Sequence, residues 1–500
     1  MTLEIVPHFI DNKSVPSRSN RTSEVFNPAT GAVTKLVGLA DASEVDGAVS
    51  SSAAAFASWS DTSLAQRTRI LFAFREILEE RAQEVAKLIT QEHGKVLSDA
   101  LGEVKRGQEV LEFACGISQL LKGSLSDQVS KDVDTYSIRQ PLGVVAGITP
   151  FNFPAMVPMW MFPIAIAAGN TFVLKPSEKD PSASFLLAEM FREAGLPEGV
   201  FNVVQGDKVA VDALLGHPKV KAISFVGSTP IARYIYENAA SERKRVQALG
   251  GAKNHMVVLP DADVENAASA AVSAAYGSAG ERCMAISVVV AVGGVADELV
   301  TAIQTKMANL NIGPGDLISS EMGPLVTRAH RDRVASYIDS AVRQGAKVIA
   351  DGRNHPLYSA DSGGFFLGAS LVDEVRPEMD VYKDEIFGPV LAVVRVEDFQ
   401  QAIDFVNSNP YANGAAIFTR DGGAARRFQR SIDAGMVGIN VPIPVPVAYY
   451  SFGGAKDSLF GDTHVHGEDG IRFYTKVKAV TSRWPEEHRE GVDFGFPQNR

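Results

Sequence analysis

The chain has 500 residues, of which 45% are hydrophobic and 21% are charged. These values are ordinary for a globular protein, and they exclude a disordered chain, a collagen-like fibre and a coiled coil. Because the net charge is −11, the chain is a poor non-specific ligand for nucleic acids and anionic membranes, and we expect neither as a partner.

The sequence contains no clear signal peptide, membrane span, disulfide framework or metal-binding motif. The N-terminus lacks the basic head and apolar run of a signal peptide, so we expect a cytoplasmic protein. The most apolar stretch, residues 155–169, contains two prolines and is too short to cross a bilayer. Two cysteines are too few for a disulfide framework or a Cys-based zinc site, and the histidines form no convincing cluster, so we expect no metal.

The chain then alternates between strands and helices. Residues 40–122 have the apolar spacing of helices. Short apolar runs follow, with helical segments between them, at residues 144–148, 171–174, 201–204, 222–226 and 245–249. Strands that alternate with helices predict a doubly wound, parallel α/β sheet, whose ligands bind at the carboxyl ends of the strands.

A second alternation begins near Met256 and predicts a second α/β lobe. Its expected strands are residues 287–293, 348–350, 391–396, 414–418 and 437–441. Residues 133–139 and 470–482 also have the pattern of strands, and we expect them to form a small sheet outside both lobes. Exposed strands of this kind often pair with another chain.

Two turns are candidate nucleotide contacts, although the chain has neither a GxGxxG pattern nor a Walker loop. Lys175 ends a strand and Glu178 follows it; a carboxylate there suits a ribose and opposes a 2′-phosphate, which favours NAD over NADP. Ser228 lies between a strand and a helix, where backbone N–H groups bind phosphate. A solvated turn and ordinary helix capping explain the same residues.

Two residues are candidates for covalent chemistry. Cys283 follows a glycine-containing turn and adjoins Arg282, whose charge is expected to lower the thiol pKa. Asn152 lies on a proline-braced turn and could stabilise an oxyanion, or form an Asx-turn. Cys115 lies in helical sequence, where packing in the core is the better interpretation.

Seven motifs occur in an order and spacing that resemble the aldehyde dehydrogenase superfamily along nearly the whole chain. They are TPFNFP (149–154), KPSE (175–178), FVGST (225–229), ALGGAKN (248–254), GERC (280–283), EIFGPV (385–390) and GGAKDS (453–458).

The resemblance implies Cys283 as the nucleophile and Asn152 as the oxyanion donor. It also implies a set of NAD contacts: Thr149, Phe151, Lys175, Glu178, Lys179, Ser228, Gly250, Glu385 and Phe387. The implied domains are an NAD-binding domain over 1–123 and 144–253, a catalytic domain over 254–447, and oligomerisation and tail segments over 124–143 and 448–500. The implied assembly is a homotetramer.

Ala248 departs from the superfamily pattern. Most members have a glutamate there, which is the general base that helps water release a free acid. A thiol co-substrate such as coenzyme A needs that base less, and the motifs GERCMAIS and NVPIPVP also resemble the CoA-acylating methylmalonate-semialdehyde dehydrogenase branch.

In that branch two arginines bind the substrate carboxylate, and the matching residues here are Arg106 and Arg282. The implied substrates are malonate semialdehyde and its 2-methyl homologue; one methyl group is worth only ~1–3 kcal/mol in a pocket, so both stay open. Three alternatives also remain: Arg106 as a surface residue, a hydrolytic NAD-dependent aldehyde dehydrogenase, and a non-catalytic nucleotide-binding protein.

Overall fold

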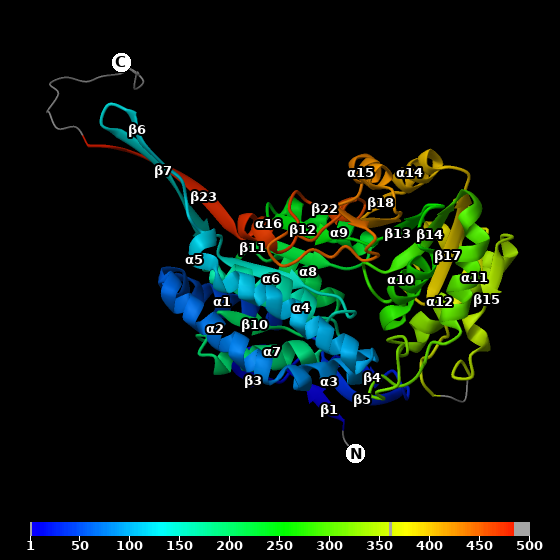
Figure 1. Ribbon diagram of the computed structural model, residues 1–500. Helices are drawn as coiled ribbons and strands as arrows, with labels where there is room; N and C mark the ends of the chain where they lie inside the picture. The colour runs from blue at the N-terminus through cyan, green and yellow to red at the C-terminus, as the bar shows by residue number, and fades with distance from the viewer. Residues whose placement is uncertain (1–2, 360–362, 485–500) are drawn as a thin grey trace.

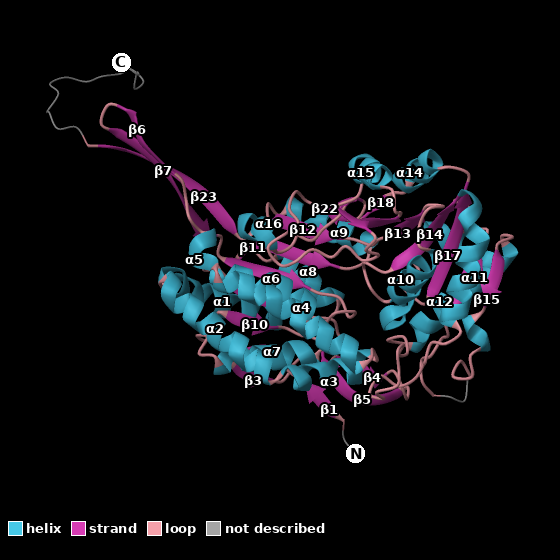
Figure 2. Ribbon diagram, viewed as in Figure 1, coloured by secondary structure: helices cyan, strands magenta, loops and turns pink. Residues whose placement is uncertain are grey.

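The computed structural model describes residues 3–359 and 363–484. Within these residues the strands form two large sheets and three small ones, with helices packed against the large sheets (Figures 1 and 2). A long three-stranded sheet, cyan and red in Figure 1, projects away from the rest of the molecule. The prediction of a mixed α/β fold with two parallel sheets is confirmed.

The first large sheet has eight strands in the order β22-β12-β11-β8-β9-β10-β2-β3. The strands from β12 to β10 are parallel, and the chain extends from β8 first toward β10 and later toward β12, which is the doubly wound arrangement. Their bounds are β8 (Val144–Ile148), β9 (Thr171–Lys175), β10 (Phe201–Val203), β11 (Val220–Val226) and β12 (Arg245–Leu249).

Nine helices, counted within the described residues, accompany this sheet. Helix α6 is buried along its whole length, because it lies between helix α4 and the strands β8 and β9. Its uniformly apolar sequence suits that position. The bounds are α1 (Ala42–Asp61), α2 (Leu64–Glu80), α3 (Ala82–His93), α4 (Leu97–Cys115), α5 (Ile117–Leu120), α6 (Met156–Ala167), α7 (Ser182–Glu193), α8 (Lys208–Gly216) and α9 (Thr229–Ser241).

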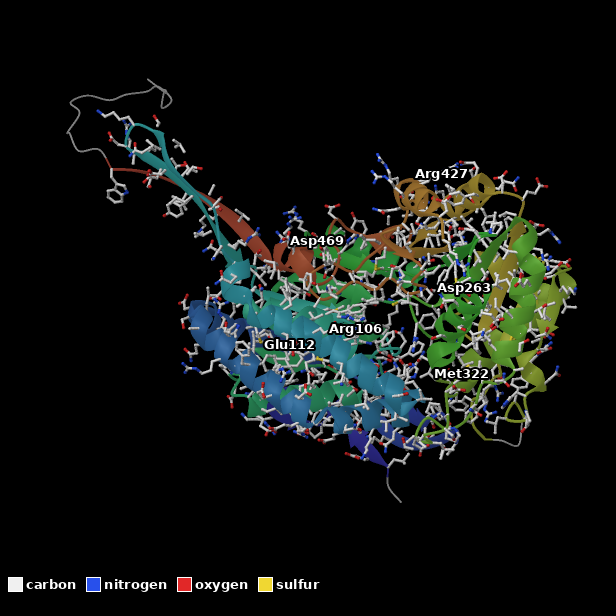
Figure 3. The ribbon with its side chains drawn as sticks, viewed as in Figure 1. Arg106, Glu112, Asp263, Met322, Arg427 and Asp469 are labelled. Carbon is white, nitrogen blue, oxygen red and sulfur yellow. The ribbon has the colours of Figure 1, made fainter. Side chains whose placement is uncertain are left out.

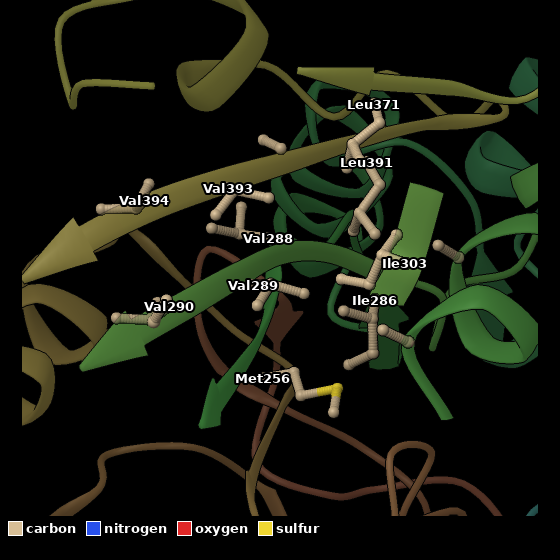
Figure 4. Packing of buried hydrophobic residues seen from close by; sticks show 14 of the residues in the cluster. Met256, Ile286, Val288, Val289, Val290, Ile303, Leu371, Leu391, Val393 and Val394 are labelled. Carbon is tan, nitrogen blue, oxygen red and sulfur yellow. The ribbon is translucent and has the colours of Figure 1, made fainter. Parts of the chain in front are cut away.

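The second large sheet has the order β15-β16-β17-β14-β13-β19-β20 and is parallel apart from β15. Valines dominate its centre: Val288, Val289 and Val290 are fully buried and pack with Met256 and Ile303 (Figure 4). Strands that are buried on both faces have continuous apolar sequences, and this is why the strands of this sheet could be predicted from the sequence. The strands are β13 (Asn254–Val258), β14 (Ile286–Val292), β15 (Lys347–Ala350), β16 (Ser370–Asp373), β17 (Val390–Val396), β19 (Gly414–Phe418) and β20 (Met436–Ile439).

The helices around this second sheet complete the lobe. They are α10 (Val264–Tyr276), α11 (Ala296–Met307), α12 (Arg328–Arg343), α13 (Asp380–Lys383), α14 (Phe399–Ser408) and α15 (Gly422–Ser431). Short 3₁₀ turns lie at η1 (Gly277–Gly280), η2 (Gly293–Val295) and η3 (Gly352–Asn354).

The projecting sheet consists of β6 (Leu125–Ser130), β7 (Val133–Pro141) and β23 (Thr475–Arg483). Strand β23 pairs with β7 over nine residues, so the two predicted segments do meet. The prediction that the strand begins at residue 470 is wrong, because residues 467–473 form helix α16 (Gly467–Phe473). Ile471 and Phe473 are both buried in that helix, which packs against α6.

Two other parts of the fold lacked a sequence prediction. The N-terminal strands β1 (Glu4–Val6), β4 (Thr22–Asn27) and β5 (Ala32–Gly38) form a small sheet, while β2 (His8–Ile10) and β3 (Lys13–Val15) extend the first large sheet. In the tail, β21 (Ala455–Lys456) pairs with β18 (Tyr411–Ala412), and β22 (Leu459–Phe460) pairs with β12. This part of the tail therefore belongs structurally to the two lobes rather than to the projecting sheet.

Across residues 3–359 and 363–484, no helix combines the length and apolarity needed to cross a membrane. The same residues contain no group of three or more His, Cys, Asp or Glu side chains suited to hold a metal ion. Cys115 is buried in the core, as expected, and both cysteines are free thiols.

Candidate active site

Cys283 lies just before β14, at the amino edge of the second sheet. The chain approaches it through a left-handed turn, with φ of 53° at Ser278, 51° at Ala279 and 75° at Gly280. The carbonyl of Cys283 accepts hydrogen bonds from the amides of Asn254 at 2.9 Å and Asn413 at 3.2 Å. The nucleophile candidate is therefore held by groups from β13 and from the residue before β19.

Two clefts meet at Cys283. One has a volume of about 510 Å³ and also contains Phe151, Ser228 and Glu385. The other, about 370 Å³, also contains Arg106 and Arg282. A thiol at such a junction is accessible to a molecule in either cleft, which is the arrangement that a reaction between a cofactor and a substrate requires.

The larger cleft brings together most of the predicted cofactor contacts from both lobes. The predicted residues in it are Phe151, Asn152, Lys179, Ser228, Gly250, Cys283, Glu385 and Phe387. The first-lobe residues follow the carboxyl ends of β8, β9, β11 and β12, where the doubly wound sheet was expected to bind its ligand. The second-lobe residues precede β14 and β17, and the sheet rule did not indicate them.

Three predicted contacts do not line this cleft. Lys175 is buried and donates to the carbonyl of Gly206 at 2.9 Å, and its Nζ lies 3.6 Å from Glu178. Burial lowers the pKa of Lys175, although the Glu178 carboxylate opposes that shift. Thr149 is 4% exposed, and its Oγ1 has no hydrogen-bond partner among the described residues.

The turn at Ser228 is suited to an anion. Helix α9 begins at Thr229 and is 13 residues long, and the Ser228 side chain makes no capping hydrogen bond within the described chain. The hydroxyl is therefore not used for capping, the alternative explanation for this residue, and it lies in the cleft beside the positive end of the helix dipole.

Asn152 is held in one orientation by buried neighbours. It is 3% exposed, and its Nδ2 donates one hydrogen to the carbonyl of Glu281 at 3.0 Å. The second amide hydrogen remains for another acceptor. The backbone carbonyl of Asn152 accepts a hydrogen bond from Lys95 Nζ at 2.5 Å, and Lys95 is paired with Glu103 at 2.8 Å, with both of those side chains fully buried.

Sequence reasoning missed Lys95 and Glu103. Glu103 also accepts hydrogen bonds from the backbone N–H groups of Ala155 and Met156, so it fixes the start of α6 as well as Lys95. No sequence motif surrounds either residue. Lys95 lies between α3 and α4 and Glu103 lies within α4, in a stretch with many other charged residues, so the sequence carried no signal that these two would be buried together.

The thiol pKa differs from the expectation. Burial raises the pKa of Cys283 to about 12, the Glu385 carboxylate adds to the rise, and Arg282 lowers it only slightly. Arg282 does lower the thiol pKa, as expected, but burial and the Glu385 carboxylate outweigh it, so the thiol is not acidic. The physical reason is that burial disfavours the charged thiolate more strongly than the guanidinium, which is also paired with Asp99 at 2.6 Å, favours it.

Glu385 has a pKa near neutrality. Burial raises it to about 7, against the opposing effects of the Ala252 N–H, which donates to Oε1 at 2.9 Å, and of the Lys253 ammonium. A carboxyl group with this pKa is divided between its neutral and charged forms at physiological pH.

Both predicted arginines line the smaller cleft with Cys283. Arg106 lies on α4, where Figure 3 shows it, and pairs with Glu109 at 2.8 Å while remaining about half exposed. Arg282 reaches the same cleft from the loop before β14. Residues 176 positions apart thus provide two cations to one cleft, and the role of Arg106 in binding a carboxylate stays a prediction beside its interpretation as a surface residue.

Position 248, where most members of the superfamily have a glutamate, holds an alanine. That residue is fully buried in β12, between Phe225 on β11 and Phe460 on β22. Sequence analysis assigned no role to another acid, Glu281. Its side chain is fully buried, and its carboxylate oxygens lie 3.7 Å from His93 Nε2 and 3.4 Å from His330 Nε2. Burial raises the Glu281 pKa to about 8, so this carboxyl is mostly neutral at pH 7.

Comparison with known proteins agrees with this geometry. Residues 15–480 match the aldehyde dehydrogenase family. The chain is 56% identical to the malonate-semialdehyde dehydrogenase of Pseudomonas aeruginosa, over 98% of this chain and 99% of that protein. It is 49% identical to malonate-semialdehyde dehydrogenase 2 of Geobacillus kaustophilus, over 96% and 99%.

Two solved structures are also very similar. A methylmalonate-semialdehyde dehydrogenase from Oceanimonas doudoroffii has a TM-score of 0.95 and 54% identity, over 97% of this chain and 99% of that one. A structure from Sinorhizobium meliloti, described as the same kind of enzyme in complex with NAD, has a TM-score of 0.96 and 52% identity, with the same coverage. The chain therefore belongs to the aldehyde dehydrogenase family, as the seven motifs predicted.

Proposed function

We propose that this chain is an NAD-dependent, CoA-acylating semialdehyde dehydrogenase. Its substrates are malonate semialdehyde and methylmalonate semialdehyde, and its products are acetyl-CoA and propionyl-CoA. The observation that carries the proposal is that two arginines and the Cys283 thiol line one cleft, while the position of the usual hydrolytic base holds Ala248. The names of the most similar relatives support the same substrates.

The residues of the larger cleft fit NAD. Within the cleft, Glu385 would hold the nicotinamide ribose, and Ser228 with the start of α9 would hold the diphosphate. Lys175 and Glu178, at and after the end of β9 and outside the cleft lining, would hold the adenosine end. The unpartnered Thr149 hydroxyl and the cleft volume support this assignment. When bound, NAD supplies the acceptor for the hydride that leaves the substrate carbon.

The chain's own groups account for acylation. The Cys283 sulfur, as thiolate, adds to the aldehyde carbon, and the carbonyl oxygen becomes an oxyanion. The free Asn152 hydrogen and a backbone N–H beside Cys283 stabilise that charge. Arg106 and Arg282 hold the substrate carboxylate, and loss of hydride leaves a thioester on Cys283.

The release step follows from the missing base. The bond between the β-carboxylate and the carbon next to the thioester breaks, the carboxylate leaves as CO₂, and the carbon left behind takes up one proton, which balances the proton lost from the thiol during acylation. The sulfur of coenzyme A then attacks the acyl carbon, and Cys283 leaves as thiolate and is reprotonated. Water is a slower nucleophile here because Ala248 accepts no proton.

We also propose a cytoplasmic homotetramer and the three-part domain division implied by the resemblance, in which β21 and β22 of the tail segment pair with strands of the lobes and β23 joins the projecting sheet. The projecting sheet exposes the apolar side chains Leu125, Tyr136 and Ile138, which are 69%, 37% and 38% exposed. Exposed apolar side chains on a sheet outside the two lobes favour contact with another copy of the chain.

The test is a substrate panel assayed with and without coenzyme A, with the products identified by mass. Without coenzyme A we expect one rapid equivalent of NADH per site and then near arrest. With it, we expect steady turnover and acetyl-CoA or propionyl-CoA as product. Free acid formed at the same rate in both assays, with oxygen from labelled water, would overturn the proposal.

A further inference from the structure

We propose that Asp99 and Gly277 are positioning residues that fix the Arg282 guanidinium beside Cys283 and thereby set the preference for aldehydes that carry a carboxylate. The inference rests on the proposed function, because it assumes that Arg282 binds the substrate carboxylate. It adds two residues from two different elements, the first turn of α4 and the end of α10, that do not touch the reacting atoms themselves.

The first argument is the ion pair. Arg282 Nη2 donates to Asp99 Oδ1 at 2.6 Å, and the two side chains are only 22% and 18% exposed. Burial favours a neutral Asp99, but the charges of Arg282 and Lys95 outweigh it and hold the pKa of Asp99 below its usual value. The pair is therefore ionised at neutral pH, and its partial burial makes it stronger than a surface pair.

The second argument is steric. A Cβ added at Gly277 would lie 2.5 Å from Arg282 Nη1, and its three nearest atoms all belong to the guanidinium. The backbone of Gly277, with φ −54° and ψ 134°, is one that alanine adopts without strain. Glycine is needed here for the space it leaves, and that space is filled by the charged end of Arg282.

The third argument is the position of the pair between two cavities. Asp99 and Arg282 line the smaller cleft with Cys283, and they also line an outer cleft of about 650 Å³ on their other side. The outer cleft contains Glu321, another carboxylate able to attract a guanidinium. The hydrogen bond to Asp99 therefore opposes a swing of Arg282 toward Glu321, and Gly277 leaves the space in which the paired guanidinium lies.

An opposing effect is also present, because the negative charge of Asp99 repels a substrate carboxylate. If that charge dominated, its removal would strengthen binding of carboxylated aldehydes. Bidentate recognition of a carboxylate depends on the direction of the guanidinium fork, so we expect orientation to outweigh repulsion. The two effects predict opposite signs, which makes the experiment decisive.

The experiment compares Asp99→Asn and Gly277→Ala with the unmodified enzyme, at saturating NAD and coenzyme A. The readout is kcat/KM for malonate semialdehyde divided by kcat/KM for propanal, which has no carboxylate. We expect this ratio to fall about tenfold in each variant, mainly through a higher KM for the semialdehyde, because one charge-assisted contact is misaligned. The value for propanal should change less than about twofold.

Glu112→Gln is the matched control, since it removes one negative charge from the same helix α4, where Glu112 pairs with Arg75 at 2.9 Å away from both clefts. We expect its ratio to stay unchanged. A general structural defect in Asp99→Asn or Gly277→Ala would lower kcat/KM equally for the semialdehyde and for propanal. That result would overturn the inference, and so would an unchanged or higher ratio of the two kcat/KM values.

Arg282→Ala separates this inference from the proposed function. If Arg282→Ala retains the preference for the semialdehyde, the carboxylate assignment itself fails. If Arg282→Ala loses the preference but Asp99→Asn and Gly277→Ala keep it, only the present inference fails. In the Arg282→Ala background, Asp99→Asn should have no further effect on the ratio, because the group that it positions is gone.

Discussion

At the scale of single residues, Cys283 is distinguished from Cys115 by its surroundings rather than by its chemistry. Burial raises the thiol pKa of both residues to about 12, but only Cys283 lies where two clefts meet. Cys283→Ser should therefore abolish NADH formation, while Cys115→Ala should retain more than about half of the activity, at a stability cost of ~1 kcal/mol for lost packing. Turnover by the Cys283 variant, followed as NADH absorbance, would contradict the nucleophile assignment.

The raised pKa of Cys283 also predicts how the free enzyme responds to alkylation. A raised pKa means that the neutral thiol dominates below about pH 12, so reaction with iodoacetamide should be slow at pH 7 and accelerate about tenfold per pH unit. A positive charge nearby favours the thiolate, so adding NAD⁺ should increase the rate at pH 7. The measurement is labelling of the Cys283 peptide by mass, and a rate independent of pH from 7 to 9 without NAD⁺ would contradict it.

At the scale of elements, the junction between α4, the turn at Asn152 and the start of α6 depends on one buried ion pair. Lys95 and Glu103 are both fully buried, so Glu103→Gln would leave the lysine charge uncompensated. We expect a loss of ~3–5 kcal/mol in the free energy of unfolding, with lower activity because Lys95 also holds the Asn152 carbonyl.

The exposed pair on the same helix is the comparison. Arg106 and Glu109 are 46% and 43% exposed, and pairs in contact with solvent contribute ~0–1 kcal/mol. Glu109→Gln should therefore leave the urea unfolding midpoint almost unchanged. Equal destabilisation by the two substitutions, measured by circular dichroism, would mean that burial of the Lys95–Glu103 pair has no energetic consequence.

At the scale of the whole molecule, the projecting sheet is the part that the two lobes leave uncovered. Leu125 is the cross-strand partner of Tyr136, and Ile138 follows two residues later, so the three side chains share one face. Ile138→Asp should reduce the mass of the assembly measured by light scattering, because a charge in an apolar interface is costly. Thr135 lies on the opposite face of the sheet, so Thr135→Asp should leave the mass unchanged. If Thr135→Asp reduced the mass and Ile138→Asp did not, the contact with another copy would be on the face of Thr135.

Several features of the fold were predictable because they depend on local sequence. The parallel strands are continuous apolar runs, as in Val144–Ile148 and Ile286–Val292, and the turns after them are marked by Gly, Pro and Asn. Helix α16 was not predictable in this way, since Ile471 and Phe473 have the two-residue spacing of a strand and become helical only by packing on α6. The short N-terminal strands likewise depend on partners far along the chain.

The features of the candidate site also separate into those that local sequence predicts and those that depend on distant contacts. From the sequence we predicted the reactive groups: a thiol after a glycine turn, an amide on a proline-braced turn, an alanine at the position of the usual base, and two arginines implied by the resemblance. The environment of those groups depends on tertiary contacts that the sequence did not indicate. These contacts bury Lys95 with Glu103, pair Arg282 with Asp99 across 183 residues, and give Cys283 a raised pKa. Residue types follow from the sequence, but burial and ion pairing depend on which distant segments meet, and those contacts set the electrostatics of the site.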